Sequence, residues 1–227
     1  MTLQLYLIRH GETKWSLSGQ HTGTTDIPLT ERGKAEAGGL SRRLRGISFA
    51  HVFTSPLQRA RRTCELAALK PAPEVEPDLA EWNYGDYEGQ RSADIIRTQP
   101  GWNIFQDGGL NGESPAQVSD RADRLIVRLR TLQGNVALFS HGHFGRVLAA
   151  RWIGLHVAEG AHFQLCTGSL SIFSYDPHHL EVPVIALWNV TSPVSFASET
   201  KQAVERWENE GGEIREQELA LEVGQRR

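Results

Sequence analysis

Short apolar runs alternate with amphipathic stretches along most of this chain. The runs are rich in β-branched and aromatic residues, which predicts strands at Leu3–Ile8, Ala50–Thr54, Asn135–Ser140, Leu170–Tyr175 and Val184–Trp188. The last two flank the turn residues Asp176–His179 and are predicted to form a hairpin at a sheet edge. Strands that alternate with helices imply right-handed crossovers. The pattern therefore predicts an α/β fold, a three-layer sandwich with a mostly parallel mixed sheet flanked by helices on both faces.

Capping residues mark where the helices between these strands begin. Thr30 precedes a helix that runs to about residue 44, and Ser55 with Pro56 predicts a serine cap followed by proline at the first helical position. Ser114 and Gln117 have the spacing of a capping box. The helix that follows carries one apolar face, at Val118, Ala122, Leu125, Ile126 and Leu129. Residues 14–27, rich in Ser, Thr, Gly and Gln, are predicted to be a loop.

The composition changes near residue 198, where Glu, Gln and Arg become dominant. We expect one domain in residues 1–197 and a charged helical tail in residues 198–227, which is either a solvated appendage or an oligomer contact in a possible homodimer. The formal net charge of -3 lacks the basic excess of a nucleic-acid binder, so no nucleic-acid partner is expected. An anionic ligand must then be attracted by local arginines.

The sequence carries no evident targeting signal. The first predicted strand begins near residue 3, which leaves no room for a signal peptide, and no apolar run approaches the length of a membrane span. We therefore expect a cytoplasmic protein with no membrane partner.

Two of the predicted strands end in a histidine. The first strand leads directly into Arg9, His10 and Gly11, and the third leads into His141. Since parallel strands present their carboxyl ends at one edge, where open α/β folds bind ligands, the two histidines are expected to converge. A neutral His10 would accept a phosphoryl group as nucleophile, and Arg9 offers a planar fork to phosphate oxygens. Gly11 would turn the chain tightly and bring backbone N–H groups to the phosphate.

Phosphoryl transfer also needs further positive charge and a proton donor. Arg59 lies one turn into the second predicted helix, so its side chain leans back over the helix start toward the same edge. The acidic, aromatic segment Leu79–Gly89 offers the carboxyl groups of Glu81, Asp86 and Glu88, and aromatic walls can raise a carboxyl pKa toward neutrality. Composition does not choose among these three.

Five blocks of this sequence, in order, resemble the histidine phosphatase superfamily, which includes the phosphoglycerate mutase-like proteins. The blocks are Arg9–Thr13, Thr22–Thr30, Ser55–Ala60, Glu81–Gly89 and Ser140–His143. The resemblance implies that His10 is the phosphate acceptor, that Arg9, Arg59 and His141 complete the pocket, and that Glu81 is the proton donor.

Two groups within the superfamily match this chain less well than its sugar phosphatases do. The acid-phosphatase and phytase branch carries an Asp directly after the second histidine, where this chain has Gly142. The cofactor-dependent mutases carry a longer insertion between the acid and that histidine. The loop Gly19–Gly23 and Arg146 are similar to those of sedoheptulose-bisphosphatase-type sugar phosphatases. Substrate contacts are accordingly expected from Ser16, which stands where many members have Asn, and from Gln20, His21, Thr22, Gly23, Gly142 and Arg146.

The sequence thus predicts a metal-independent phosphomonoesterase without a cofactor, which hydrolyses small phosphate esters, sugar phosphates or bisphosphates, through phosphohistidine. The alternatives are a cofactor-dependent phosphoglycerate mutase, a regulatory binding protein that has kept the phosphate pocket, and a phosphatase of protein phosphohistidine. A metal site at His141 and His143 is disfavoured because this pair lacks a carboxylate or Cys partner at convincing spacing.

Overall fold

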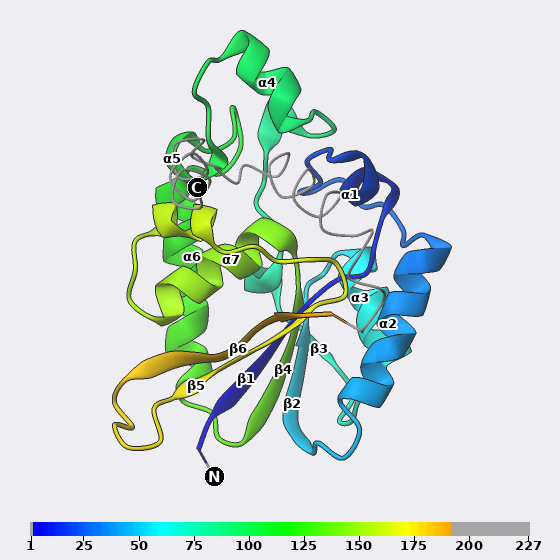
Figure 1. The fold of residues 1–227 in the computed structure, drawn as a ribbon, viewed down its shortest axis with the longest axis vertical. Helices are drawn as coiled ribbons and strands as arrows, with labels where there is room; N and C mark the ends of the chain where they lie inside the picture. Colours follow the sequence, from blue (N-terminus) through cyan, green and yellow to red (C-terminus); the bar gives the residue numbers. More distant parts are fainter. Residues whose placement is uncertain (1, 192–227) are drawn as a thin grey trace, which may run out of the picture.

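A single mixed sheet runs through the part of the chain that the computed structural model describes, residues 2–191 (Figure 1). Its strands are β1 (Gln4–Arg9), β2 (Phe49–Thr54), β3 (Glu74–Val75), β4 (Asn135–Ser140), β5 (Leu170–Tyr175) and β6 (Pro183–Val190). Their order across the sheet is β3-β2-β4-β1-β5-β6. The pairs β2–β3, β2–β4 and β1–β4 are parallel, whereas β5 runs antiparallel to both β1 and β6. The predicted mixed sheet and its edge hairpin are therefore confirmed.

Helices cover both faces of this sheet, as Figure 1 shows for α2 and α3 on one side and α6 and α7 on the other. The helices are α1 (Lys14–Ser18), α2 (Glu31–Arg43), α3 (Gln58–Ala67), α4 (Ser92–Thr98), α5 (Ile104–Asp107), α6 (Pro115–Leu129) and α7 (Gly142–Trp152), with the 3-10 turns η1 (Pro77–Leu79), η2 (Gly85–Tyr87) and η3 (Val157–His162). Leu5 and Leu7 of β1 belong to the core under α6 and α7, and Tyr6 and Ile8 to the core under α2 and α3. The three-layer sandwich is therefore confirmed.

The helix starts follow the predicted caps with one exception. Thr30 accepts a hydrogen bond from Gly33 N, and Ser114 and Gln117 form the capping box. However, α3 begins at Gln58 rather than directly after Ser55, and no side chain caps it. The predicted helix start was wrong. The Ser55 hydroxyl accepts from Leu57 N at 3.3 Å but also bonds to the ring of His141, and the helical hydrogen bonds begin only at Leu57 O. The predicted loop of residues 14–27 also contains the short helix α1.

Strand register brings the carboxyl ends of the central strands to one level. Arg9 of β1 pairs with Ser140 of β4, and His10 N donates to Ser140 O at 3.0 Å. On the other side of β4, Ser55 N donates to Phe139 O at 2.9 Å. The segments that follow β2, β4 and β1 therefore lie side by side at this edge.

Two further expectations concern the ends of the chain and the membrane. The tail predicted for residues 198–227 lies outside the described residues. In the described residues, no helix is both long and apolar enough to cross a bilayer.

Candidate active site

The rings of His10 and His141 meet at the carboxyl edge of the sheet. Their centroids are 5.2 Å apart at an interplanar angle of 60°, and both residues are buried. Burial lowers the pKa of His10 well below its ordinary value, and the charges of Arg59 and Arg9 lower it further. The pKa of His141 is also lowered well below its ordinary value, first by burial and then by Arg59 and His10. Both imidazoles are therefore neutral at neutral pH.

Hydrogen bonds determine which nitrogen of each ring carries the hydrogen. The Nδ1 of His10 lies 2.7 Å from Gly11 O, and a carbonyl oxygen only accepts. The lone pair of His10 is consequently on Nε2. Arg59 donates from Nε to His141 Nδ1 at 3.2 Å, so the His141 hydrogen sits on Nε2, which donates to Ser55 Oγ at 2.7 Å.

Two buried arginines stand beside these rings. Arg9 comes from the end of β1, and its Nη1 donates to Leu165 O. Arg59, in the first turn of α3, donates from Nη1 to Thr25 O at 3.0 Å and from Nη2 to the carbonyls of Thr22 and Gly23 at 2.9 and 2.8 Å. Arg59 thus links the carboxyl edge of the sheet to the loop that follows α1.

Glu81 is the one of the three candidate acids that faces the cavity beside His10. Its carboxyl group accepts from Trp82 N at 2.9 Å, from Phe144 N at 2.7 Å and from His143 N at 3.1 Å, the last two in the first turn of α7. Burial raises the pKa of Glu81, although these backbone bonds and the charges of Arg59 and Arg9 act in the opposite direction.

The two other carboxyl groups have structural partners. Glu88 accepts from the backbone N–H groups of Gly23, Thr24 and Thr25 and from the Thr25 hydroxyl. Asp86 accepts from Asn111 Nδ2 at 2.7 Å. Glu88 therefore anchors the loop whose carbonyls accept from Arg59. Composition could not choose among Glu81, Asp86 and Glu88, but in the structure only Glu81 of these three lines the cavity.

A narrow cavity opens over His10. Its lining consists of Arg9, His10, Ser16, Gln20, His21, Thr22, Glu81, Tyr84 and His143. Four predicted substrate-binding side chains are thus brought to the cavity. Three predicted substrate-binding residues, Gly23, Gly142 and Arg146, are not part of this lining, and neither are Arg59 and His141, which were expected to complete the pocket.

The predicted residues outside the lining have clear packing or bonding functions. Gly23 donates to Glu88 and accepts from Arg59, so it fixes the loop. A Cβ at Gly142 would lie 3.1 Å from the Arg9 guanidinium carbon, so this glycine makes room for Arg9. Arg146 is fully buried and donates from Nε and Nη2 to the backbone carbonyls of η3, at 2.9 and 2.8 Å. Its expected substrate contact is therefore replaced here by a bond to the protein.

Gly11 also differs from its predicted role. Its N–H donates to Thr63 Oγ1 at 3.1 Å rather than facing the cavity. A Cβ at this position would lie 2.2 Å from Gly33 O. Gly11 is needed because the backbone after β1 passes directly against α2, and its own N–H is not one of the groups available to a phosphate.

Sequence reasoning missed two side chains of the lining, Tyr84 and His143. The Tyr84 hydroxyl lies 2.6 Å from His143 Nδ1, and the ring of His21 stacks on Tyr84 with centroids 4.6 Å apart. The sequence did contain signals for both residues, because Tyr84 lies in the acidic, aromatic segment Leu79–Gly89 and His143 comes two residues after His141. Among residues 2–191, no three His, Cys, Asp or Glu side chains are grouped as ligands for a metal ion.

Comparisons with known proteins agree with this geometry. The profile of the Histidine phosphatase superfamily (branch 1) matches residues 5–191. An acid phosphatase of Mycobacterium tuberculosis is 39% identical over 197 residues, which cover 85% of this chain and 96% of that protein. The sedoheptulose 1,7-bisphosphatase of Saccharomyces cerevisiae is 31% identical over 252 residues, which cover 82% of this chain and 93% of that protein.

A solved structure shows the same fold. The product of an open reading frame of Mycobacterium tuberculosis has a TM-score of 0.79 at 36% identity, and the match covers 84% of this chain and 99% of that chain. Both the family and the fold that the sequence motifs predicted are confirmed. The chain belongs to the histidine phosphatase superfamily, branch 1.

Proposed function

We propose that this protein is a phosphomonoesterase that transfers the phosphoryl group of a small ester first to His10 and then to water. The observation that carries the proposal is the neutral His10 ring, whose Nδ1 is held by Gly11 O and whose Nε2 is left as nucleophile. The guanidinium groups of Arg9 and Arg59 supply the positive charge that equatorial phosphate oxygens require, so the chemistry uses no metal ion.

The first step forms a P–N bond and breaks the P–O bond to the leaving group. His10 Nε2 attacks phosphorus in line, and the Glu81 carboxyl group donates its proton to the departing oxygen. The raised pKa of Glu81 supports this role, because burial favours the protonated acid.

The second step reverses the roles of these groups. The Glu81 carboxylate takes a proton from water, the water oxygen attacks phosphorus, and the P–N bond breaks to release phosphate. His10 returns to its neutral form, and Glu81 regains its proton. His141 donates from Nε2 to Ser55 Oγ, so it supports the site without taking the phosphoryl group.

The substrates proposed are sugar phosphates or bisphosphates. The alcohol that leaves would occupy the part of the cavity lined by His21, Tyr84 and His143, whose mixed polar and aromatic character suits a hydroxylated carbon skeleton. The similarity to a relative named sedoheptulose 1,7-bisphosphatase supports the same class. Phosphate release from a panel of sugar phosphates, nucleotides and 3-phosphoglycerate would identify the substrate.

Replacement of the nucleophile tests the mechanism. His10→Ala should abolish the hydrolysis of p-nitrophenyl phosphate in the presence of EDTA, whereas His162→Ala, at an exposed position on η3, should leave it unchanged. Brief incubation of the wild type with labelled substrate should yield an acid-labile, alkali-stable phosphoprotein that His10→Ala does not form. Turnover retained by His10→Ala would overturn the proposal.

The same preparation distinguishes hydrolysis from the mutase alternative. With 3-phosphoglycerate and a bisphosphoglycerate primer, a phosphatase releases inorganic phosphate, and a mutase forms 2-phosphoglycerate. The compact stretch between Glu81 and His141 and the phosphatase relatives favour phosphate release.

A further inference from the structure

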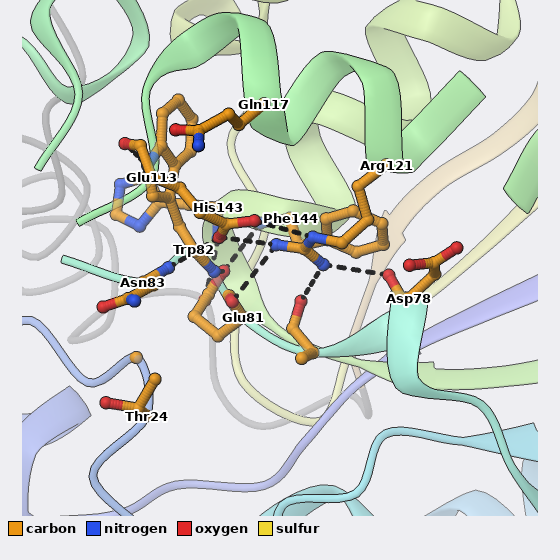
Figure 2. A network of polar contacts seen from close by, with 12 residues as sticks. Thr24, Asp78, Glu81, Trp82, Asn83, Glu113, Gln117, Arg121, His143 and Phe144 are labelled. Carbon is orange, nitrogen blue, oxygen red and sulfur yellow. Dashed lines mark hydrogen bonds and ion pairs between the residues drawn. The ribbon is translucent and has the colours of Figure 1, made fainter. Parts of the chain in front are cut away.

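Arg121 of α6 is a buried arginine that lies outside the cavity and binds the backbone of the segment that carries Glu81. Its Nη1 donates to Asp78 O at 2.9 Å and to Ala80 O at 2.7 Å, and its Nη2 donates to Glu81 O at 3.3 Å. Nε and Nη2 also pair with the two carboxylate oxygens of Glu113, both at 2.9 Å. Figure 2 shows this guanidinium between Glu113 and the backbone from Asp78 to Glu81.

Glu113 holds the other side of Glu81. Its Oε2 accepts from Asn83 N at 2.8 Å, and its backbone oxygen accepts from Trp82 Nε1 at 2.8 Å. Glu113 N donates to Asn83 O, also at 2.8 Å. The Arg121–Glu113 pair therefore bonds to residues before Glu81, to Glu81 itself and to both residues after it.

The same arginine lies against the residue that supports the carboxyl group. The Arg121 guanidinium carbon is 4.4 Å from the ring centroid of Phe144, whose N–H donates to Glu81 Oε1 at 2.7 Å. One buried side chain is thus in contact with the backbone of Glu81 and with a donor to its carboxyl group.

The segment depends on these bonds because it has no regular structure of its own. Glu81 lies between η1 and η2, where neither a helix nor a sheet ladder satisfies the backbone carbonyls. Arg121 is buried and Glu113 is partly buried, so their ion pair costs desolvation, and an apolar pair of the same size would serve for packing alone. The cost is offset here by carbonyl contacts that an apolar pair could not make.

We propose that Arg121, locked by Glu113, is a positioning residue that holds Glu81 at the distance and angle needed for proton transfer to the leaving oxygen. The inference rests on the proposed role of Glu81 as general acid. Proton transfer requires the two oxygens to approach to hydrogen-bond distance, so a small displacement of the Glu81 backbone slows the step that needs this proton.

Two esters that differ in their need for a proton test the proposal. Phenyl phosphate releases a basic oxygen that must be protonated, whereas 2,4-dinitrophenyl phosphate releases a phenolate that leaves without a proton. For Arg121→Met we expect kcat/KM to fall about 10- to 100-fold for phenyl phosphate and less than about 3-fold for the dinitrophenyl ester. Equal losses for both esters, or no loss for either, would overturn the proposal, since a structural defect acts on both alike.

Arg124→Met is the matched control. Arg124 lies three residues further along α6, has an exposed side chain, and donates to the Asp78 carboxylate rather than to the backbone around Glu81. Both esters should be turned over by this variant within about 2-fold of the wild type. Glu113→Gln is a milder variant that keeps an acceptor for Asn83 N, and it should show the same selective loss. It serves as the test if Arg121→Met does not fold.

Hydrogen exchange separates this inference from the proposed function. The amides of Trp82 and Asn83, which donate to Glu81 and Glu113, should exchange about 10-fold faster or more in Arg121→Met or Glu113→Gln and at the wild-type rate in Arg124→Met. A wild-type protein inactive on both esters would refute the proposed function, yet the exchange rates would still test whether Arg121 and Glu113 hold the segment around Glu81. Unchanged exchange in the Arg121 and Glu113 variants would overturn the inference whatever the activity.

Discussion

Lowering the pH from about 7.5 to about 5 should weaken the folded state through His10 and His141. In the unfolded chain each imidazole has the ordinary pKa of 6.5, whereas in the fold the pKa of both lies well below it, first because of burial and then because of Arg59. The unfolded state therefore takes up protons that the folded state refuses. The stability contributed by the two neutral imidazoles is fully present above pH 6.5, the pKa of an imidazole in the unfolded chain, and is lost as the pH falls below that value.

The magnitude follows from proton linkage. One imidazole that stays neutral in the fold costs up to about 2 kcal/mol over this pH range, and two cost up to about 4 kcal/mol. Glu81 acts in the opposite direction, because burial raises its pKa and the folded state takes up that proton first. The stability of the wild type should thus fall by less than the two histidines alone would give.

Urea unfolding followed by tryptophan fluorescence measures this effect across the pH range. On acidification, His10→Asn should lose about 2 kcal/mol less than the wild type, because it has one fewer imidazole to protonate on unfolding. His178→Asn is the control, since His178 lies on the exposed turn between β5 and β6 and is in water in both states. If His10→Asn lost as much stability as the wild type, His10 would not be a buried neutral ring, and the reasoning about the nucleophile would fail.

Three further substitutions, one of them paired with Gly38→Ala as a control outside the site, test other parts of the site. Ser55→Ala removes the acceptor of the His141 Nε2 hydrogen and leaves a buried donor without a partner, so the free energy of unfolding should fall by about 1–3 kcal/mol in urea titrations, and no change would contradict the assigned tautomer. Gly11→Ala should destabilise by about 2 kcal/mol or more because its Cβ meets backbone, whereas Gly38→Ala in α2, with open space around its Cβ, should stabilise by about 0.5–1 kcal/mol in the same titration. Glu81→Gln should lower kcat/KM for phenyl phosphate about 100-fold or more and remove the alkaline limb of its pH profile, which in the wild type reflects loss of the Glu81 proton; a retained limb would assign it to another group.

The sequence was sufficient where chemistry follows directly from a strand. His10 and His141 each come immediately after an apolar run, and parallel pairing in register puts the two strand ends at one level. Ser114 and Thr30 were likewise identified from local patterns, because a cap depends on residues only a few positions away. Such features can be predicted without knowing which distant segments of the chain meet.

The sequence was insufficient where a side chain has two plausible partners. Ser55 is of a residue type that caps helices, and its hydroxyl accepts from Leu57 N, but it also bonds to His141, which is 86 residues away. Arg146 matches a family pattern that implies a substrate contact, yet its position on α7 turns it toward the carbonyls of η3. Only the packing of α7 against η3 and of β2 against β4 decides between these partners.

The Arg121–Glu113 pair, which bonds to the backbone around Glu81, shows the same limit more strongly. Glu113 lies two residues before α6 and Arg121 lies in the second turn of this helix, and no motif in the sequence marks either of them. Their bonds to residues 78–83 depend on the irregular segment that passes over the helix, and no local pattern encodes that path. Tyr84 and His143 were not predicted for a related reason, because they join the cavity lining as a hydrogen-bonded pair from two distant segments.

The neighbouring positions of β1 and β4 in the sheet have a consequence for biosynthesis. These are the first and the fourth strands to leave the ribosome, so well over half of the polypeptide must be made before the two imidazoles can meet. A prematurely terminated product would carry His10 without His141, Arg146 or the α7 amides that hold Glu81. Chains that end before His141 should therefore be inert toward phosphoesters, and we expect catalytic competence only once translation has passed the second histidine.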